Sequence, residues 1–151
     1  MIRMRHPWLH CLIVMLVALM LLSGTGLNVA AAQTVSGTGM LEASGYGTVT
    51  LSGSGTVTIQ EGAGVIWVQG ADSIEAPGRG RRAELPHGAV RLTGYSGRVK
   101  IQGEDMTIRI AGGLIDLTAS GSGSAWLRGE GTYTTNNSSG TWTPRGIRVT
   151  F

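Results

Sequence analysis

The sequence has few of the residues from which disulfides and metal sites are built. Its 151 residues include one cysteine, Cys11, and three histidines, of which only His87 lies beyond residue 32. A disulfide needs two cysteines, and zinc sites use several Cys or His ligands. We therefore expect no intrachain disulfide, no metal site and no cofactor. The sequence also offers no partner for His87 in a Cys-His nucleophilic pair.

Charged residues are scarce as well, at 14% of the chain. Beyond residue 32 the charges nearly cancel, because ten Lys and Arg residues face nine Asp and Glu residues. Nucleic-acid binding depends on a concentrated positive field. The composition therefore predicts no nucleic-acid partner.

Only one long hydrophobic run is present, Cys11–Leu22, and it is preceded by Arg3 and Arg5. Ala30–Ala32 follows as a small-residue cleavage site. These are the three regions of a secretory signal peptide, which we place at residues 1–32. An uncleaved anchor is the alternative, but the run is short of the roughly 20 residues that span a bilayer. We expect an exported protein (periplasm, cell surface or extracellular) with no stable membrane span after cleavage.

Glycine is abundant and recurs in a fixed phrase, apolar-x-apolar-x-Gly. Alternation with a period of two places both apolar side chains on one face of a strand, and the glycine allows the backbone to turn. Repetition every eight or nine residues indicates a repeat fold. We expect about a dozen short strands in a single domain over residues 33–151. Four consecutive phrases start nine residues apart: Val90-x-Leu92-x-Gly94, Val99-x-Ile101-x-Gly103, Ile108-x-Ile110-x-Gly112 and Leu117-x-Ala119-x-Gly121.

The fold class is therefore all-β, and two architectures fit the spacing. The first is a two-sheet β-solenoid or β-roll, in which equivalent residues stack about 17 residues apart and matched coil lengths are required. The alternative is an antiparallel meander folded into a β-sandwich or barrel. Residues 77–88 contain Pro77, Pro86 and three arginines. We expect a loop there that bulges from the sheet or follows its edge.

The glycine-rich phrases also carry a resemblance. Gly45-Tyr46-Gly47-Thr48-Val49, Gly53-Ser54-Gly55-Thr56-Val57 and Gly121-Ser122-Gly123-Ser124 resemble uncharacterised exported bacterial glycine-rich β-repeat proteins. They are also similar to the Gly-Ser-Gly punctuation of adhesin-like β-helical domains. The resemblance covers Val35 to about Trp142 and implies an exported β-repeat fold with a surface role. It implies no catalytic or binding residue.

The outward middle position of each phrase supplies the candidate ligand-contact residues: Trp67, Trp126, Trp142, Arg91 and Arg109. Trp and Arg on a rigid β-face are typical of glycan or protein contacts. If alternate units share a sheet, Trp126 lies beside Arg109. One face then carries Glu42, Thr58, Glu75, Arg91, Arg109, Trp126 and Trp142, and the other carries Thr50, Trp67, Ala83, Lys100, Thr118, Thr134 and Thr150.

We expect no catalytic residues. Carboxylate pairs such as Glu104 with Asp105, or Asp116 with Glu130, are what a glycosidase on a β-helix would need, but acids at turns are more often solvated. The function that the sequence favours is a non-enzymatic exported structural or adhesin-like surface binding protein. The alternative is a carbohydrate-binding module that uses surface Trp residues. The expected partner is an extracellular glycan or an envelope polymer.

Overall fold

The computed structural model describes residues 39–61 and 64–151, and within them the all-β prediction is confirmed. Eight strands and one 3₁₀ turn, η1 (Pro86–Gly88), make up its regular structure. No helix in the described residues is long and apolar enough to cross a membrane. The predicted signal peptide, residues 1–32, lies outside these residues.

Two of the strands are far longer than the sequence pattern predicts. The expectation of a dozen short strands is wrong because most glycines bend a strand without ending it. β1 and β6 each run through several glycine positions while their hydrogen-bonded partners continue. The strands are β1 (Gly39–Glu61), β2 (Val65–Gln69), β3 (Ser73–Glu75), β4 (Arg79–Glu84), β5 (Val90–Ser96), β6 (Val99–Thr135), β7 (Ser139–Trp142) and β8 (Ile147–Thr150).

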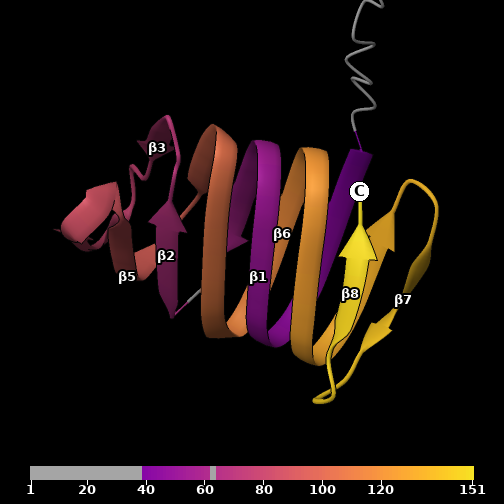
Figure 1. Ribbon diagram of the computed structural model, residues 1–151. Helices are drawn as coiled ribbons and strands as arrows, with labels where there is room; N and C mark the ends of the chain where they lie inside the picture. Colours follow the sequence, from indigo (N-terminus) through magenta and orange to yellow (C-terminus); the bar gives the residue numbers. More distant parts are fainter. Residues whose placement is uncertain (1–38, 62–63) are drawn as a thin grey trace, which may run out of the picture. The chain divides into compact units, whose positions relative to one another are not determined.

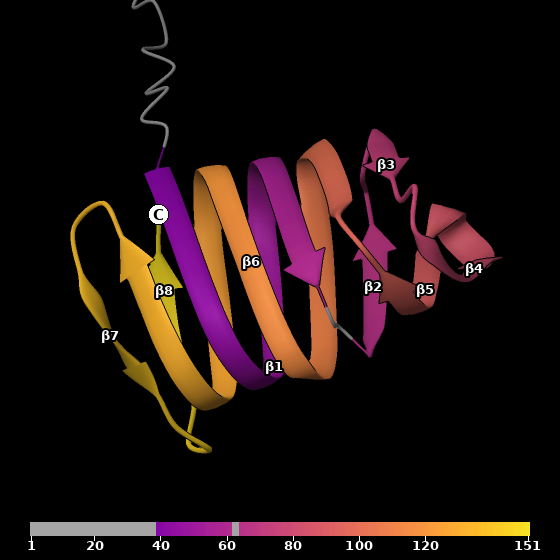
Figure 2. The ribbon, with the colours of Figure 1, turned by 180° about the vertical axis from the view of Figure 1, so that it is seen from behind.

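β1 and β6 wind together, and their passes alternate in Figures 1 and 2. Val49 of β1, for example, lies opposite Ile110 of β6 on one side and opposite Leu127 of β6 on the other. β6 therefore repeats about every 17 residues, but its successive coils do not stack directly, because a pass of β1 lies between them. All strand pairs among the described residues are antiparallel. Antiparallel pairing belongs to the alternative prediction, although β1 and its partner β6 are distant in sequence.

Glycine faces glycine where the two long strands bend. Gly55 lies opposite Gly121, with φ angles of +136° and +141°. A Cβ atom on Gly55 would lie 2.1 Å from the carbonyl oxygen of Ser120, and one on Gly121 would lie 2.1 Å from that of Ser54. Only glycine fits so close a crossing. Both strands therefore bend at the same place, and the residues beyond the bend stay in register.

The core lies inside these coils and is formed by the paired apolar positions of the repeated phrases. Ile101, Ile108 and Ile110 have no exposed surface, and Val99 is 1% exposed. Burying an aliphatic side chain of this size contributes about 1.5–3 kcal/mol. The prediction that both apolar side chains of a phrase share one face is thus confirmed: that face is the interior, and the alternate positions point outward.

The sheet ends at β4, which pairs only with β5, and β3, β7 and β8 each pair with β6. The segment 77–88, predicted as a loop or an edge, contains the edge strand β4 followed by η1. Arg82 and Glu84 form an exposed ion pair on β4, with 3.0 Å between Nε and Oε1. Charged side chains on an edge strand hinder pairing with other chains.

Candidate functional site

The outward side chains near the middle of the strands form a continuous row across the sheet. Residues directly opposite each other in antiparallel strands place their side chains on the same face. Thr50 lies opposite both Trp126 and Arg109, and Trp67 lies opposite both Arg109 and Arg91. The complete row, from β8 to β4, is Arg148, Trp126, Thr50, Arg109, Trp67, Arg91 and Ala83.

A second row runs beside the first, two residues further along each strand. Its members are Arg128, Thr48, Ala111, Val65, Thr93 and Arg81. We call the two rows together the Arg–Trp face. It carries five arginines, all of them exposed, and no Asp or Glu is among its residues. Charges of one sign gathered on one face attract ligands of the opposite sign, even though the chain beyond residue 32 is nearly neutral.

Two arginines of this face, Arg109 and Arg128, contact neighbouring groups. The guanidinium carbon of Arg109 lies 5.5 Å from the centroid of the Trp67 ring, within the range of a cation–π contact. Arg128 donates from Nε to the carbonyl oxygen of Pro144 at 3.0 Å. Both side chains are thereby held in place, which reduces the entropy that a ligand must remove on binding.

The face is hollowed between β2, β5 and β4. The hollow has a volume of about 460 Å³ and is lined by Val65, Trp67, Arg81, Arg91 and Thr93. Arg81 lies opposite Thr93, and Arg91 lies opposite Ala83 on the same strand pair. The two arginines are therefore diagonal neighbours. An aromatic ring, an aliphatic side chain and two guanidinium groups share one depression.

The structure brings together four of the five predicted contact residues, Trp67, Trp126, Arg91 and Arg109. The fifth, Trp142, is 2% exposed, so its prediction as a surface contact is wrong. Cβ atoms built on Gly131 and Gly45 would lie 2.3 and 2.7 Å from its ring, because the indole fills the space that these glycines leave. Trp142 is a core residue at the β7 end of the sheet.

The predicted composition of the two faces is also wrong. Trp126 does not lie beside Arg109, because Thr50 on β1 separates them. Trp67 and Thr50, expected on the opposite face, share the face of Arg109. The reason is that successive units alternate between the faces within β1–β4 and within β5–β6, but the alternation changes phase at the β4–β5 connection, where Ala83 and Arg91 lie opposite each other on one face. Glu42, Thr58 and Glu75 instead lie with Lys100, Thr118 and Thr134 on the other side.

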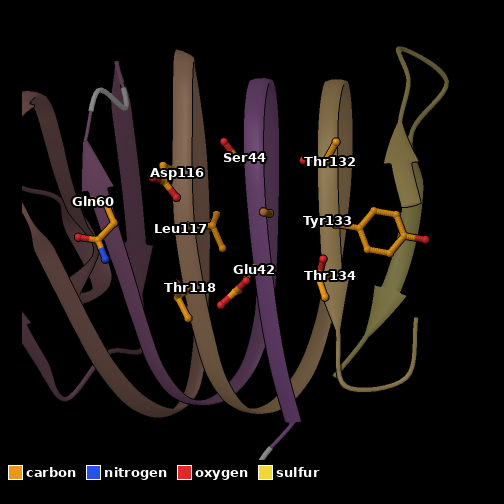
Figure 3. A pocket seen from close by; sticks show the side chains of 10 residues that line it. Glu42, Ser44, Gln60, Asp116, Leu117, Thr118, Thr132, Tyr133 and Thr134 are labelled. Atoms are coloured by element: carbon orange, nitrogen blue, oxygen red, sulfur yellow. The ribbon is translucent and has the colours of Figure 1, made fainter. Parts of the chain in front are cut away.

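That other side has a polar hollow of about 440 Å³, shown in Figure 3. Glu42, Thr118 and Thr134 lie at one level, and Ser44, Asp116 and Thr132 lie at the next. Gln60 contributes an amide. The hollow is rich in hydroxyl groups and carries two carboxylates but no cation, so its electrostatic character is opposite to that of the Arg–Trp face.

The carboxylates considered for catalysis do not converge. Asp116 lies opposite Ser44, whereas Glu130 lies opposite Tyr46, beyond the glycine pair Gly45 and Gly131. Glu130 accepts a hydrogen bond from the Tyr46 hydroxyl. This hydrogen bond raises the pKa of Tyr46 above its usual 10.0, assisted by desolvation and by the negative charge of Glu130. Among the described residues, no group of three or more His, Cys, Asp or Glu side chains could hold a metal ion.

The sequence pattern singles out neither Arg128 nor Arg148, and it places Arg81 only among the three arginines of residues 77–88. The signal that could have found Arg148 is its place between two apolar residues, in Ile147-Arg148-Val149. Arg128 likewise follows the buried Leu127. Arg81 gives no such signal, because it lies beside a register shift in β4.

No family model, no curated protein and no solved structure matches this chain. Its function must therefore be argued from the chemistry of these faces.

Proposed function

We propose that the chain is an exported, non-enzymatic β-roll that binds an extracellular glycan or an envelope polymer through its Arg–Trp face. The observation that carries this proposal is the uninterrupted row from Arg148 to Arg91, in which Arg and Trp gather on one side of the sheet. Hydrogen-bonded antiparallel passes on both sides of each strand hold that row rigid. A rigid face costs little conformational entropy on binding.

The leader sequence supports the export part of the proposal, since residues 1–32 have the three regions of a signal peptide. The strand register supports a non-enzymatic role, because Asp116 lies opposite Ser44 whereas Glu130 lies opposite Tyr46, so the two carboxylates do not form a pair. The adhesin-like character rests on the extended form of the face. Side chains from seven different strand passes contribute to it, so it suits a long ligand better than a small one.

The second candidate function is a carbohydrate-binding module that stacks neutral sugars on Trp. Trp126 favours it, because its side chain is 42% exposed although it is a large aromatic residue. Indole rings present a flat apolar surface with a polar tip, which suits the C–H faces of sugar rings. Trp67 is less available for this role because Arg109 covers part of its ring.

The experiment that tests surface binding is a panel of immobilised neutral glycans, acidic glycans and cell-wall polymers, probed with the purified chain. We expect retention on at least one polymer. The double variant Arg109→Gln, Trp126→Ala should lose this retention.

The matched control is the double variant Glu42→Gln, Thr118→Ala, which changes the opposite face. It should bind as well as the unmodified chain. Failure of the chain to bind any polymer, or equal loss in both double variants, would contradict binding through the Arg–Trp face. The single variants separate the two residues: loss of binding in Trp126→Ala without loss in Arg109→Gln would favour the carbohydrate-binding module.

A further inference from the structure

The hollow between β2, β5 and β4 combines two kinds of contact that few ligands satisfy together. Trp67 and Val65 supply an apolar surface, and Arg81 and Arg91 supply guanidinium groups. Sugar rings can place a C–H face against an indole. A carboxylate or sulfate pairs with guanidinium through charge-assisted, often bidentate hydrogen bonds. A sugar that carries an acidic group meets both requirements.

The positive charge continues beyond the hollow along the same row. Arg109 lies two strands away from Arg91, and Arg148 lies three strands beyond Arg109. Neighbouring strands are about 4.8 Å apart. The arginines therefore stand at multiples of a distance close to one sugar unit of an extended polysaccharide. Trp126 lies between Thr50 and Arg148 and provides a second ring in the line.

We propose that the Arg–Trp face binds a linear acidic polysaccharide, which lies across the strands with one acidic sugar in the hollow between Trp67, Arg81 and Arg91. This inference rests on the proposed surface-binding function and specifies its ligand class. The polymer follows the row toward Arg109 and Arg148. Its repeated negative charges meet arginines, and its sugar rings meet indoles.

Charge complementarity favours this occupant over other polyanions. Nucleic-acid binding depends on a dense and general positive field, and the ten basic and nine acidic residues beyond residue 32 leave the positive charge confined to the separated arginines of the Arg–Trp face. Binding within the interface of an anionic membrane uses a continuous apolar face of Trp, Phe and Leu beside the cations. The two rows hold only two indoles, separated by Arg109 and Thr50, and the half-buried Val65. The face instead offers fixed, separated charges.

The opposite face provides an internal control. Its hollow holds Glu42 and Asp116 without a cation among its lining residues. A negatively charged polymer is repelled there and attracted to the Arg–Trp face. Removal of those two acids should therefore leave binding of the polymer unchanged or slightly stronger.

The test measures the affinity of the purified chain for polygalacturonate, with amylose as the uncharged polymer. Isothermal titration at low and high salt gives both the affinity and its ionic component. We expect binding to polygalacturonate, weak or absent binding to amylose, and an affinity that falls as salt rises, because exposed charges are screened. The double variant Arg81→Gln, Arg91→Gln should bind about 25-fold more weakly, at about fivefold for each exposed ion pair lost.

Two further variants separate charge from shape. Arg91→Lys keeps the charge but loses the planar fork, so it should fall between the unmodified chain and Arg91→Gln. Glu42→Gln with Asp116→Asn should bind polygalacturonate at least as well as the unmodified chain. All four substituted side chains are exposed, so circular dichroism should show the same fold throughout.

Several results would overturn the inference. One is equal affinity for amylose and polygalacturonate, which would leave the surface-binding function standing as neutral-sugar stacking. Preference for a single-stranded oligonucleotide or for anionic lipid vesicles over polygalacturonate would assign the face to another class of polyanion. An unchanged affinity in Arg81→Gln, Arg91→Gln would remove the hollow from the site. Binding in the polymer panel without binding to polygalacturonate would refute this ligand class alone.

Discussion

Replacing Gly55 by alanine tests the winding of β1 and β6 directly. The new Cβ would lie 2.1 Å from the carbonyl oxygen of Ser120 and 2.9 Å from the Cα of Gly121. Ordinary contacts begin near 3.4 Å, so the two strands must separate by about 1 Å. The obstacles are backbone atoms, which cannot rotate out of the way as a side chain does.

The expected loss in the free energy of unfolding has two sources. The φ of +136° at Gly55 is sparsely populated by residues with a side chain, at a cost of about 1–3 kcal/mol. Overpacking adds about 1–3 kcal/mol. Together they lower the free energy of unfolding by about 2–6 kcal/mol. At about 4 °C per kcal/mol for a domain of this size, Tm should fall by roughly 8–24 °C.

The assays are urea denaturation, for the free energy of unfolding, and thermal denaturation, for Tm, each followed by circular dichroism and Trp fluorescence, with Gly113→Ala as the matched control. A Cβ on Gly113 meets nothing within 4 Å, and its φ is not positive. Gly113→Ala should therefore leave stability unchanged or raise it by about 0.4–1 kcal/mol. If Gly55→Ala proves as stable as Gly113→Ala, Gly55 and Gly121 do not cross closely, and the pairing of β1 with β6 described above is refuted.

Three other predictions concern single side chains. Trp142→Ala should lower the free energy of unfolding by about 3–5 kcal/mol in urea denaturation. Trp142→Phe should lower it less, because the buried indole N–H has no hydrogen-bond partner to lose. Equal losses in the two variants would argue against a buried ring. Tyr46 should ionise above the usual pH of about 10 in an absorbance titration, and Glu130→Gln should lower its pKa. Because the folded pKa exceeds the unfolded one, the stabilisation is complete below about pH 10 and is lost as pH rises through the folded pKa; an unchanged titration in Glu130→Gln would refute the hydrogen bond. Arg82→Ala should change stability by no more than about 0.5 kcal/mol, since the ion pair with Glu84 is exposed, and a larger loss would indicate a structural role for the edge strand.

Which residues are buried follows almost entirely from the sequence. Ile108 and Ile110 lie two residues apart with Arg109 between them, and alternation in a strand sends them to one side and Arg109 to the other. This rule is local, so it holds whichever strand becomes the neighbour. The failed prediction for Trp142 shows its limit. The indole is buried by Gly45 and Gly131, which are distant in sequence from each other, and no local pattern indicates that contact.

The sequence by itself determined the all-β class and the paired apolar interior, because each depends on neighbours within a few residues. Only the tertiary structure decided which outward side chains share a face. Thr50 meets Arg109 on one side and Trp126 on the other because β1 is inserted between two passes of β6. Because β1 lies antiparallel between two passes of β6, residues of the two strands become neighbours on one face. A one-residue change of register would send every outward side chain to the core. The Arg–Trp face therefore exists only once β1 and β6 have paired.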